Sequence, residues 1–164
     1  MNPIDLMVEI IQQHNPENIW LDSQLMGYRL LGNTNRGEIG EEFVRRYLRD
    51  AGMEISHGNR TEEIDLVVEG FSAEIKTASL GANGTFQFNH IRLDRDYDFL
   101  ICIGICPDQI VFNMWTSDEV HSESAGHLVK MAQDQAVTYK LTKLRGDMRP
   151  IDGFISTVQS LLDL

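Results

Sequence analysis

Hydrophobic and polar residues follow two different periods along the chain, and the changes of period predict its elements. Apolar residues at helical spacing predict three helices, at 4–13, 37–51 and 151–162. Shorter apolar runs bounded by turn residues predict five strands, at 53–56, 64–68, 71–77, 99–106 and 109–115. A short helix is expected to begin in Thr116–Glu119, where acidic residues would lie near the positive end of its dipole.

These elements predict an α+β fold in which helices flank a mixed central sheet of four to five strands. The length of 164 residues suits a single domain spanning residues 1–164. We expect its core in about residues 37–115, an N-terminal helical segment in 1–35 and a C-terminal helical segment in 117–164. Residues 32–35 are expected to form a loop before the helix that starts near Gly37.

The dipeptide Glu69–Gly70 predicts a hairpin turn, because glycine tolerates the positive φ that two-residue turns require. This turn would bring three pairs of apolar residues face to face on one side of the hairpin: Val68 with Phe71, Leu66 with Ala73, and Ile64 with Ile75. Asp65 would then face Glu74 on the opposite side, with Lys76 two residues farther along. A shift of one residue would break both matches, so the pattern selects this register.

Two facing carboxylates repel each other, and a divalent cation resolves that conflict. Mg²⁺ takes one or two carboxylates and keeps water ligands that a substrate phosphate can replace. Asp65 and Glu74 are therefore candidate metal ligands, and Lys76 is a candidate to orient water or to stabilise developing negative charge. The alternative is a hairpin whose outer face is charged only because it is solvated.

Asp65 followed by Glu74–Ile75–Lys76 resembles the signature of the PD-(D/E)XK nuclease superfamily. Gly40–Glu41 and the residues up to Leu66 are similar to the helix and first strands of its Holliday-junction-resolvase-like members. The resemblance covers about residues 37–77, and Ile64 stands where the motif has proline. It implies a restriction endonuclease-like α/β/α fold, a Mg²⁺ cofactor that Mn²⁺ can replace, and catalysis by Asp65, Glu74, Lys76 and Glu41. Asp65, Glu74 and Glu41 would be the metal ligands.

The same resemblance implies double-stranded DNA as the partner and a homodimer as the assembly. Residues 86–91 and 96–101 are similar to the region after the Glu-x-Lys strand in restriction-type members, where Gln87 would lie beside the scissile phosphate. A surface or buried glutamine without a catalytic role is the alternative.

The net charge of −11 is unusual for a protein that binds a phosphate backbone. Basic residues do gather locally, and four of them are candidate DNA contacts: Lys140, Lys143, Arg145 and Arg149. A second group, Arg45, Arg46 and Arg49, belongs to the predicted helix after Gly37. Because salt screens charge over about 8–10 Å, a local basic surface could act despite the acidic total. Either group could instead be a solvated face.

The two cysteines, Cys102 and Cys106, are four residues apart in one predicted strand, too far apart for a disulfide. We expect both to be small buried side chains. Residues 1–5 lack the basic and apolar pattern of a secretory leader, and no apolar run reaches membrane-spanning length. We therefore expect a cytoplasmic protein without a membrane partner.

Three functions follow from these patterns. The first is a Mg²⁺-dependent DNA endonuclease similar to type II restriction enzymes, and the second is a structure-specific repair or junction-resolving nuclease. The third is a non-catalytic descendant of the nuclease fold that binds proteins or mimics DNA, which the acidic charge would suit.

Overall fold

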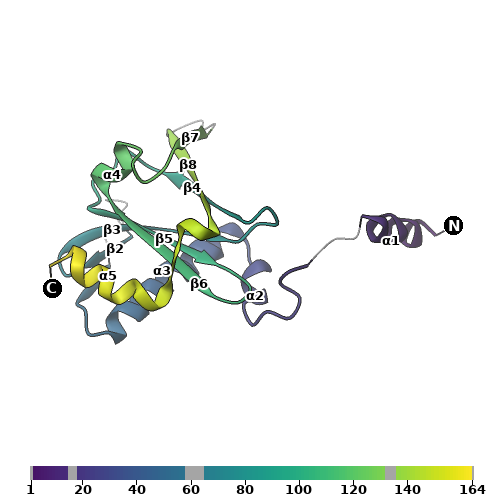
Figure 1. Ribbon diagram of the computed structural model, residues 1–164, viewed down its shortest axis with the longest axis horizontal. Coiled ribbons are helices and arrows are strands. Elements are labelled where there is room, and N and C mark those ends of the chain that lie inside the picture. The colour runs from purple at the N-terminus through teal and green to yellow at the C-terminus, as the bar shows by residue number, and fades with distance from the viewer. Residues whose placement is uncertain (1, 15–17, 58–64, 132–135, 164) are drawn as a thin grey trace.

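The computed structural model describes residues 2–14, 18–57, 65–131 and 136–163 of the chain (Figure 1). Its strands form a six-stranded sheet with the order β1-β2-β3-β5-β6-β9 and a three-stranded sheet with the order β4-β8-β7. The strands of the six-stranded sheet are β1 (Ile55–His57), β2 (Leu66–Val68), β3 (Phe71–Ser79), β5 (Phe99–Ile105), β6 (Ile110–Thr116) and β9 (Arg149–Pro150). Those of the three-stranded sheet are β4 (Thr85–Ile91), β7 (Leu128–Met131) and β8 (Thr138–Leu144).

The centre of the larger sheet is the parallel pair of β3 and β5, while its other neighbouring strands are antiparallel. Every residue of β5 is buried, as its continuous apolar sequence predicts for a central strand. Cys102 lies in this strand, and it and Cys106 are free, buried thiols. The α+β prediction with a mixed sheet flanked by helices is confirmed, with one strand more than the expected four to five.

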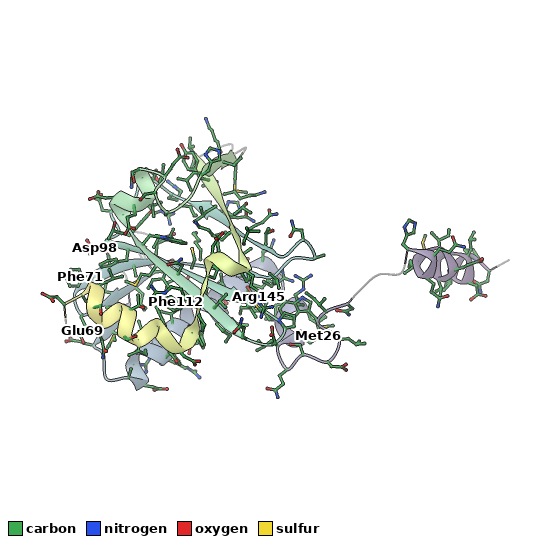
Figure 2. All side chains as sticks on the ribbon, viewed as in Figure 1. Met26, Glu69, Phe71, Asp98, Phe112 and Arg145 are labelled. Carbon is green, nitrogen blue, oxygen red and sulfur yellow. The ribbon has the colours of Figure 1, made fainter. Side chains whose placement is uncertain are left out.

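The hairpin between β2 and β3 has the expected register. Leu66 pairs with Ala73, and Val68 pairs with Phe71. Both turn residues have positive φ, 49° at Glu69 and 84° at Gly70, which is typical of the two-residue turn that suits the twist of a hairpin. Figure 2 labels Glu69 and Phe71 at this end of the sheet. The expected pairing of Ile64 with Ile75 lies outside the described residues.

Two helices cover one face of the large sheet. Helix α3 (Asn33–Asp50) buries Val44 and Leu48, and helix α5 (Phe154–Leu161) buries Phe154 and Val158. The Phe154 ring lies 5.0 Å from Phe112 of β6 and 6.3 Å from Tyr47 of α3. The two helices therefore lie on the same face of the large sheet, next to each other, as Figure 1 also shows.

The opposite face of the large sheet is covered by the three-stranded sheet. Phe86 and Phe88 of β4 are fully buried, and the Phe86 ring packs against Gly104 of β5, where an added Cβ would lie 2.8 Å from the ring. Lys143 of β8 lies 5.1 Å from the ring of Trp115 on β6. Helix α4 (Ser117–His121) follows β6 directly and begins with a capping box formed by Thr116 and Glu119.

Three expectations about the elements need correction. The segment 117–164 is not helical throughout, because β7, β8 and β9 lie within it. Residues 33–35 are not a loop, since α3 starts at Asn33, four residues before the expected start. The apolar spacing that predicts this helix includes Ile39, which was expected to be buried with the other apolar residues but is 42% exposed.

The first part of the chain contains helix α1 (Pro3–Gln13) and the short helix α2 (Met26–Arg29). Asn2 caps α1 through a hydrogen bond from the Ile4 N–H, and α1 buries none of its residues. It stands apart from the sheets in Figure 1. Among the described residues, no helix combines the length and the apolar character needed to cross a membrane.

Candidate active site

The candidate site lies beside β3, where the pairing with β2 stops. The last paired residue of β2 is Leu66, which lies opposite Ala73. Beyond Leu66, the side chain of Asp65 bonds to the edge of β3 in place of the backbone. Its Oδ2 accepts a hydrogen bond of 2.8 Å from the Ile75 N–H. The carboxylate thus takes the place of a strand carbonyl and is held beside Glu74.

Glu74 is the most unusual side chain of the site, because it is an acidic residue that is only 1% exposed. Its Oε1 lies 3.2 Å from the Lys76 Nζ and 3.7 Å from an Arg95 guanidinium nitrogen. Burial raises the pKa of Glu74, the nearby Asp65 raises it further, and Lys76 and Arg95 oppose the rise. Its Oε2 is buried and has no hydrogen-bond partner among the described residues.

Glu41 brings a third carboxylate from helix α3. Its pKa is raised to about 7, first by burial and then by the charge of Asp65 and a hydrogen bond with it; Glu74 adds to the rise and Lys76 opposes it. A hydrogen bond between two carboxyl groups needs a proton on one of them. The negative charge of Asp65 thus contributes to the raised pKa of both Glu41 and Glu74.

Gly40 sets how closely this helix approaches the sheet. A Cβ at Gly40 would overlap the Thr77 hydroxyl and lie 2.8 Å from Thr77 Cβ. Glycine therefore allows α3 to touch β3 one residue before Glu41. The contact between Gly40 and Thr77 therefore places the Glu41 carboxylate near the edge of β3.

These groups line one cavity of about 490 Å³. Its walls include all four predicted catalytic residues, Glu41, Asp65, Glu74 and Lys76. Gln87 of β4 also lines it, so the structure brings the predicted glutamine to the same space as the acids. The cavity therefore joins an acidic wall from the large sheet and α3 to an uncharged wall from the small sheet.

The four predicted basic contacts do not line the cavity. Arg145 forms an ion pair with Asp108, at 2.8 Å, and Arg149 bonds to Thr157 and covers the Phe112 ring. Lys143 lies over Trp115. Lys140 is on the other face of β8, because side chains alternate along a strand.

Other lining residues were not among the predicted site residues, and they include Asn89, His90 and Arg95. A register shift between Phe88 and Ile91 places Asn89 and His90 together opposite Lys140, and His90 has a φ of 61°. Such a bulge breaks the alternation and re-aims side chains. Arg95 comes from the connection to β5, where no periodic pattern marks it in the sequence.

The donor set suits a hard divalent cation because it offers carboxylate oxygens. The buried Glu74 Oε2, which finds no hydrogen-bond partner within the described parts of the chain, is the clearest candidate ligand atom. In the described part of the chain, no three Asp, Glu, His or Cys side chains already stand close enough together to hold a metal. Binding an ion would thus require Glu41, Asp65 and Glu74 to draw together.

No family model and no curated protein matches the sequence. The structure of a bacterial homing endonuclease, I-Ssp6803I, is similar to 81% of this chain and to 99% of that chain, with 19% sequence identity and a TM-score of 0.48. At this sequence identity and TM-score, the likeness does not indicate the function of this chain.

Proposed function

We propose that the chain is a metal-dependent DNA endonuclease that hydrolyses phosphodiester bonds in this cavity, in the manner of type II restriction enzymes. The observation that carries the proposal is the grouping of Glu41, Asp65 and Glu74 with Lys76 around a carboxylate oxygen that has no partner among the described residues. Such a grouping would lower the stability of the folded chain if it had only a structural role, because buried charges are unfavourable unless they are paired or hydrogen-bonded.

A bound divalent cation would neutralise the repulsion among these acids. Glu41, Asp65 and Glu74 would hold Mg²⁺, or Mn²⁺ in its place. There the ion would supply positive charge to a phosphoryl oxygen and make water a better nucleophile at neutral pH. The positive charge of the ion would favour the ionised form of Glu41 and so oppose the rise in its pKa.

Lys76 would act on the substrate directly. Its ammonium group is 3.2 Å from Glu74 Oε1 and its side chain is about one-fifth exposed, so it lies at the boundary between buried acid and open cavity. From there it can orient the attacking water or stabilise the negative charge that develops on the phosphate. Gln87, on the facing wall, is positioned to hold a phosphate or a base next to the bond that breaks.

Cleavage of supercoiled plasmid tests the proposal. The purified chain should convert plasmid to nicked and linear forms with Mg²⁺ or Mn²⁺, and should leave it intact in excess chelator. Asp65→Asn should lose activity and metal binding, while the exposed Asp163→Asn, which makes the same chemical change far from the cavity, should keep both. A chain that cuts equally well in chelator, or an active Asp65→Asn variant, would contradict the proposal.

Comparing cleavage of branched DNA with cleavage of linear duplex separates a structure-specific nuclease, which prefers branched DNA, from a restriction-type enzyme. We also propose a homodimer, because two identical sites related by a two-fold axis match the two antiparallel strands of a duplex. Sedimentation with and without DNA tests this assembly, and a monomer in both conditions would exclude it.

A further inference from the structure

The three-stranded sheet β4-β8-β7 has two chemically different faces. Its inner face is apolar and buried, with side chains that are at most 8% exposed: Phe86, Phe88, Leu128 and Leu141. Its outer face consists of cross-strand pairs, Gln87 with Thr142, Thr85 with Leu144, and Lys140 with Val129. Gln87 and Thr142 are exposed, and Leu144 and Val129 are 57% and 51% exposed.

We infer that the outer face of this sheet binds the major groove of double-stranded DNA and selects its sequence. The inference rests on the proposed function for the nature of the substrate. It adds a second surface, outside the acidic site, that decides which duplex enters the cavity.

The charge of the three strands supports this partner. They have seven, four and seven residues and contain no Asp or Glu. Of their lysines, Lys140 lies on the outer face, whereas Lys130 and Lys143 follow the alternation of the inner face. The whole chain has 25 acidic residues and a net charge of −11. An acid-free sheet in such a chain is the surface on which a phosphate backbone meets the least repulsion.

Continuity with the cavity gives the sheet its position. Thr85, Gln87 and Asn89 of β4 belong to the cavity wall, so the outer face runs into the space beside Glu74 and Lys76. The bulge after Phe88 turns both Asn89 and His90 toward that space. If a duplex lies on β4 and β8, these strands contact its bases. The phosphates beside those bases then lie close to the candidate catalytic groups.

The side chains on the outer face suit B-form DNA rather than RNA. A two-stranded ribbon fits the major groove of DNA, where an amide pairs with adenine, a lysine with guanine, and a threonine methyl or another apolar group with the thymine methyl. The major groove of duplex RNA is too deep and narrow for such contacts. The β4–β8 pair offers all three types of contact.

Two lysines of the same strand provide a matched test. Lys140 lies on the outer face, whereas Lys143 lies over Trp115 on the inner side. Lys140→Met and Lys143→Met remove the same charge and keep the apolar stem. Binding is measured by fluorescence anisotropy on a short DNA duplex over a range of salt concentrations, in a Lys76→Ala background that prevents cleavage.

We expect Lys140→Met to weaken binding about 5–10-fold near 0.1 M salt and to reduce the slope of its salt dependence by about 1. Lys143→Met should stay near the parent value, with thermal unfolding confirming that it is folded. Equal effects of the two variants, no effect of Lys140→Met, no DNA binding by the parent, or equal binding of an RNA duplex would each overturn the inference.

Sequence selection gives an independent measurement. In the same background, Gln87→Leu should reduce the preference for one base among randomised duplexes by about 5–150-fold, the loss expected for one bidentate amide contact. A preference that is absent or unchanged contradicts the inference. The proposed catalysis is judged separately: a chain that binds through Lys140 but never cuts plasmid retains this surface and loses the nuclease assignment.

Discussion

The two sheets of this molecule meet at one cavity and bring opposite properties to it. The large sheet contributes the buried Glu74 of β3 and, next to the first residue of β2, the half-buried Asp65. The small sheet contributes uncharged and basic side chains on an exposed face that its buried side supports. The difference indicates that charge concentrated by burial suits bond breaking, whereas exposed hydrogen-bonding groups suit recognition.

Removing the lysine of the acidic wall should have the largest effect on activity. Lys76→Ala should lower the rate of plasmid cleavage by at least about 10²–10³-fold, as expected for loss of one group that stabilises charge in the transition state. DNA affinity should remain close to wild type, because the surface inferred to bind DNA lies on the other sheet. Lys130→Ala, an exposed lysine of β7, is the control for the charge change and should still cut. Cleavage by Lys76→Ala at the wild-type rate would exclude the assigned role.

The two faces of the small sheet can be compared in one strand. Leu141→Ala should lower the free energy of unfolding by about 2–5 kcal/mol, because Leu141 is fully buried between the sheets. Leu144→Ala, on the outer face, should change it by less than about 0.5 kcal/mol. Chemical denaturation measures both. Similar losses for the two variants would mean that the outer face is also packed.

The contact that positions Glu41 can be tested with two glycines of α3. Gly40→Ala should cost about 1–3 kcal/mol of unfolding free energy, because the new methyl group overlaps Thr77. Gly37→Ala has no atom within 4 Å of its added carbon and should gain about 0.5–1 kcal/mol from helix propensity. Metal titration should show weaker binding only for Gly40→Ala. A neutral Gly40→Ala would mean that α3 can shift without loss.

The smallest effect concerns His121 of α4, which lies outside both sheets. Its ring nitrogens lie 2.8 Å from the Ser117 carbonyl and 2.7 Å from the Leu93 carbonyl, and these two hydrogen bonds raise its pKa, with Asp118 adding to the rise. Because the folded-state pKa is above the unfolded one, the stabilisation is complete below pH of about 6.5 and is lost as pH rises through the folded value.

His121→Asn should therefore flatten the stability profile on the alkaline side of that range. Thermal unfolding from acidic to mildly alkaline pH measures the difference. Identical profiles for the variant and the wild type would show that the two carbonyl contacts do not favour the charged ring.

The large sheet could be predicted from the sequence because its signals agree with one another. The apolar residues of β2 and β3, the Glu69–Gly70 turn and the acidic pair all select one register. The small sheet was missed for the opposite reason. In β8 only Leu141 and Thr138 are buried, and in β4 the bulge at Asn89 and His90 breaks the alternation that marks a strand.

The site could be predicted where it depends on local spacing and not where it depends on tertiary contact. Asp65, Glu74 and Lys76 follow from strand alternation, and Glu41 from a helix pattern. Arg95 reaches Glu74 from a connecting segment, and nothing in its neighbours along the chain indicates this. The basic stretch from Lys140 to Arg149 does not form one continuous surface, because Arg145 pairs with Asp108 and Arg149 bonds to Thr157. Its DNA contacts stay a prediction.

The turn at Glu69–Gly70 limits how the chain can change length. The turn has two residues, and residues 66–73 between Asp65 and Glu74 are even in number. Lengthening it by two residues, one in each strand, would keep both acids on the same side. Adding one residue would turn one carboxylate toward the helices and the other toward the cavity. Insertions near this turn should therefore be tolerated according to their parity rather than their size.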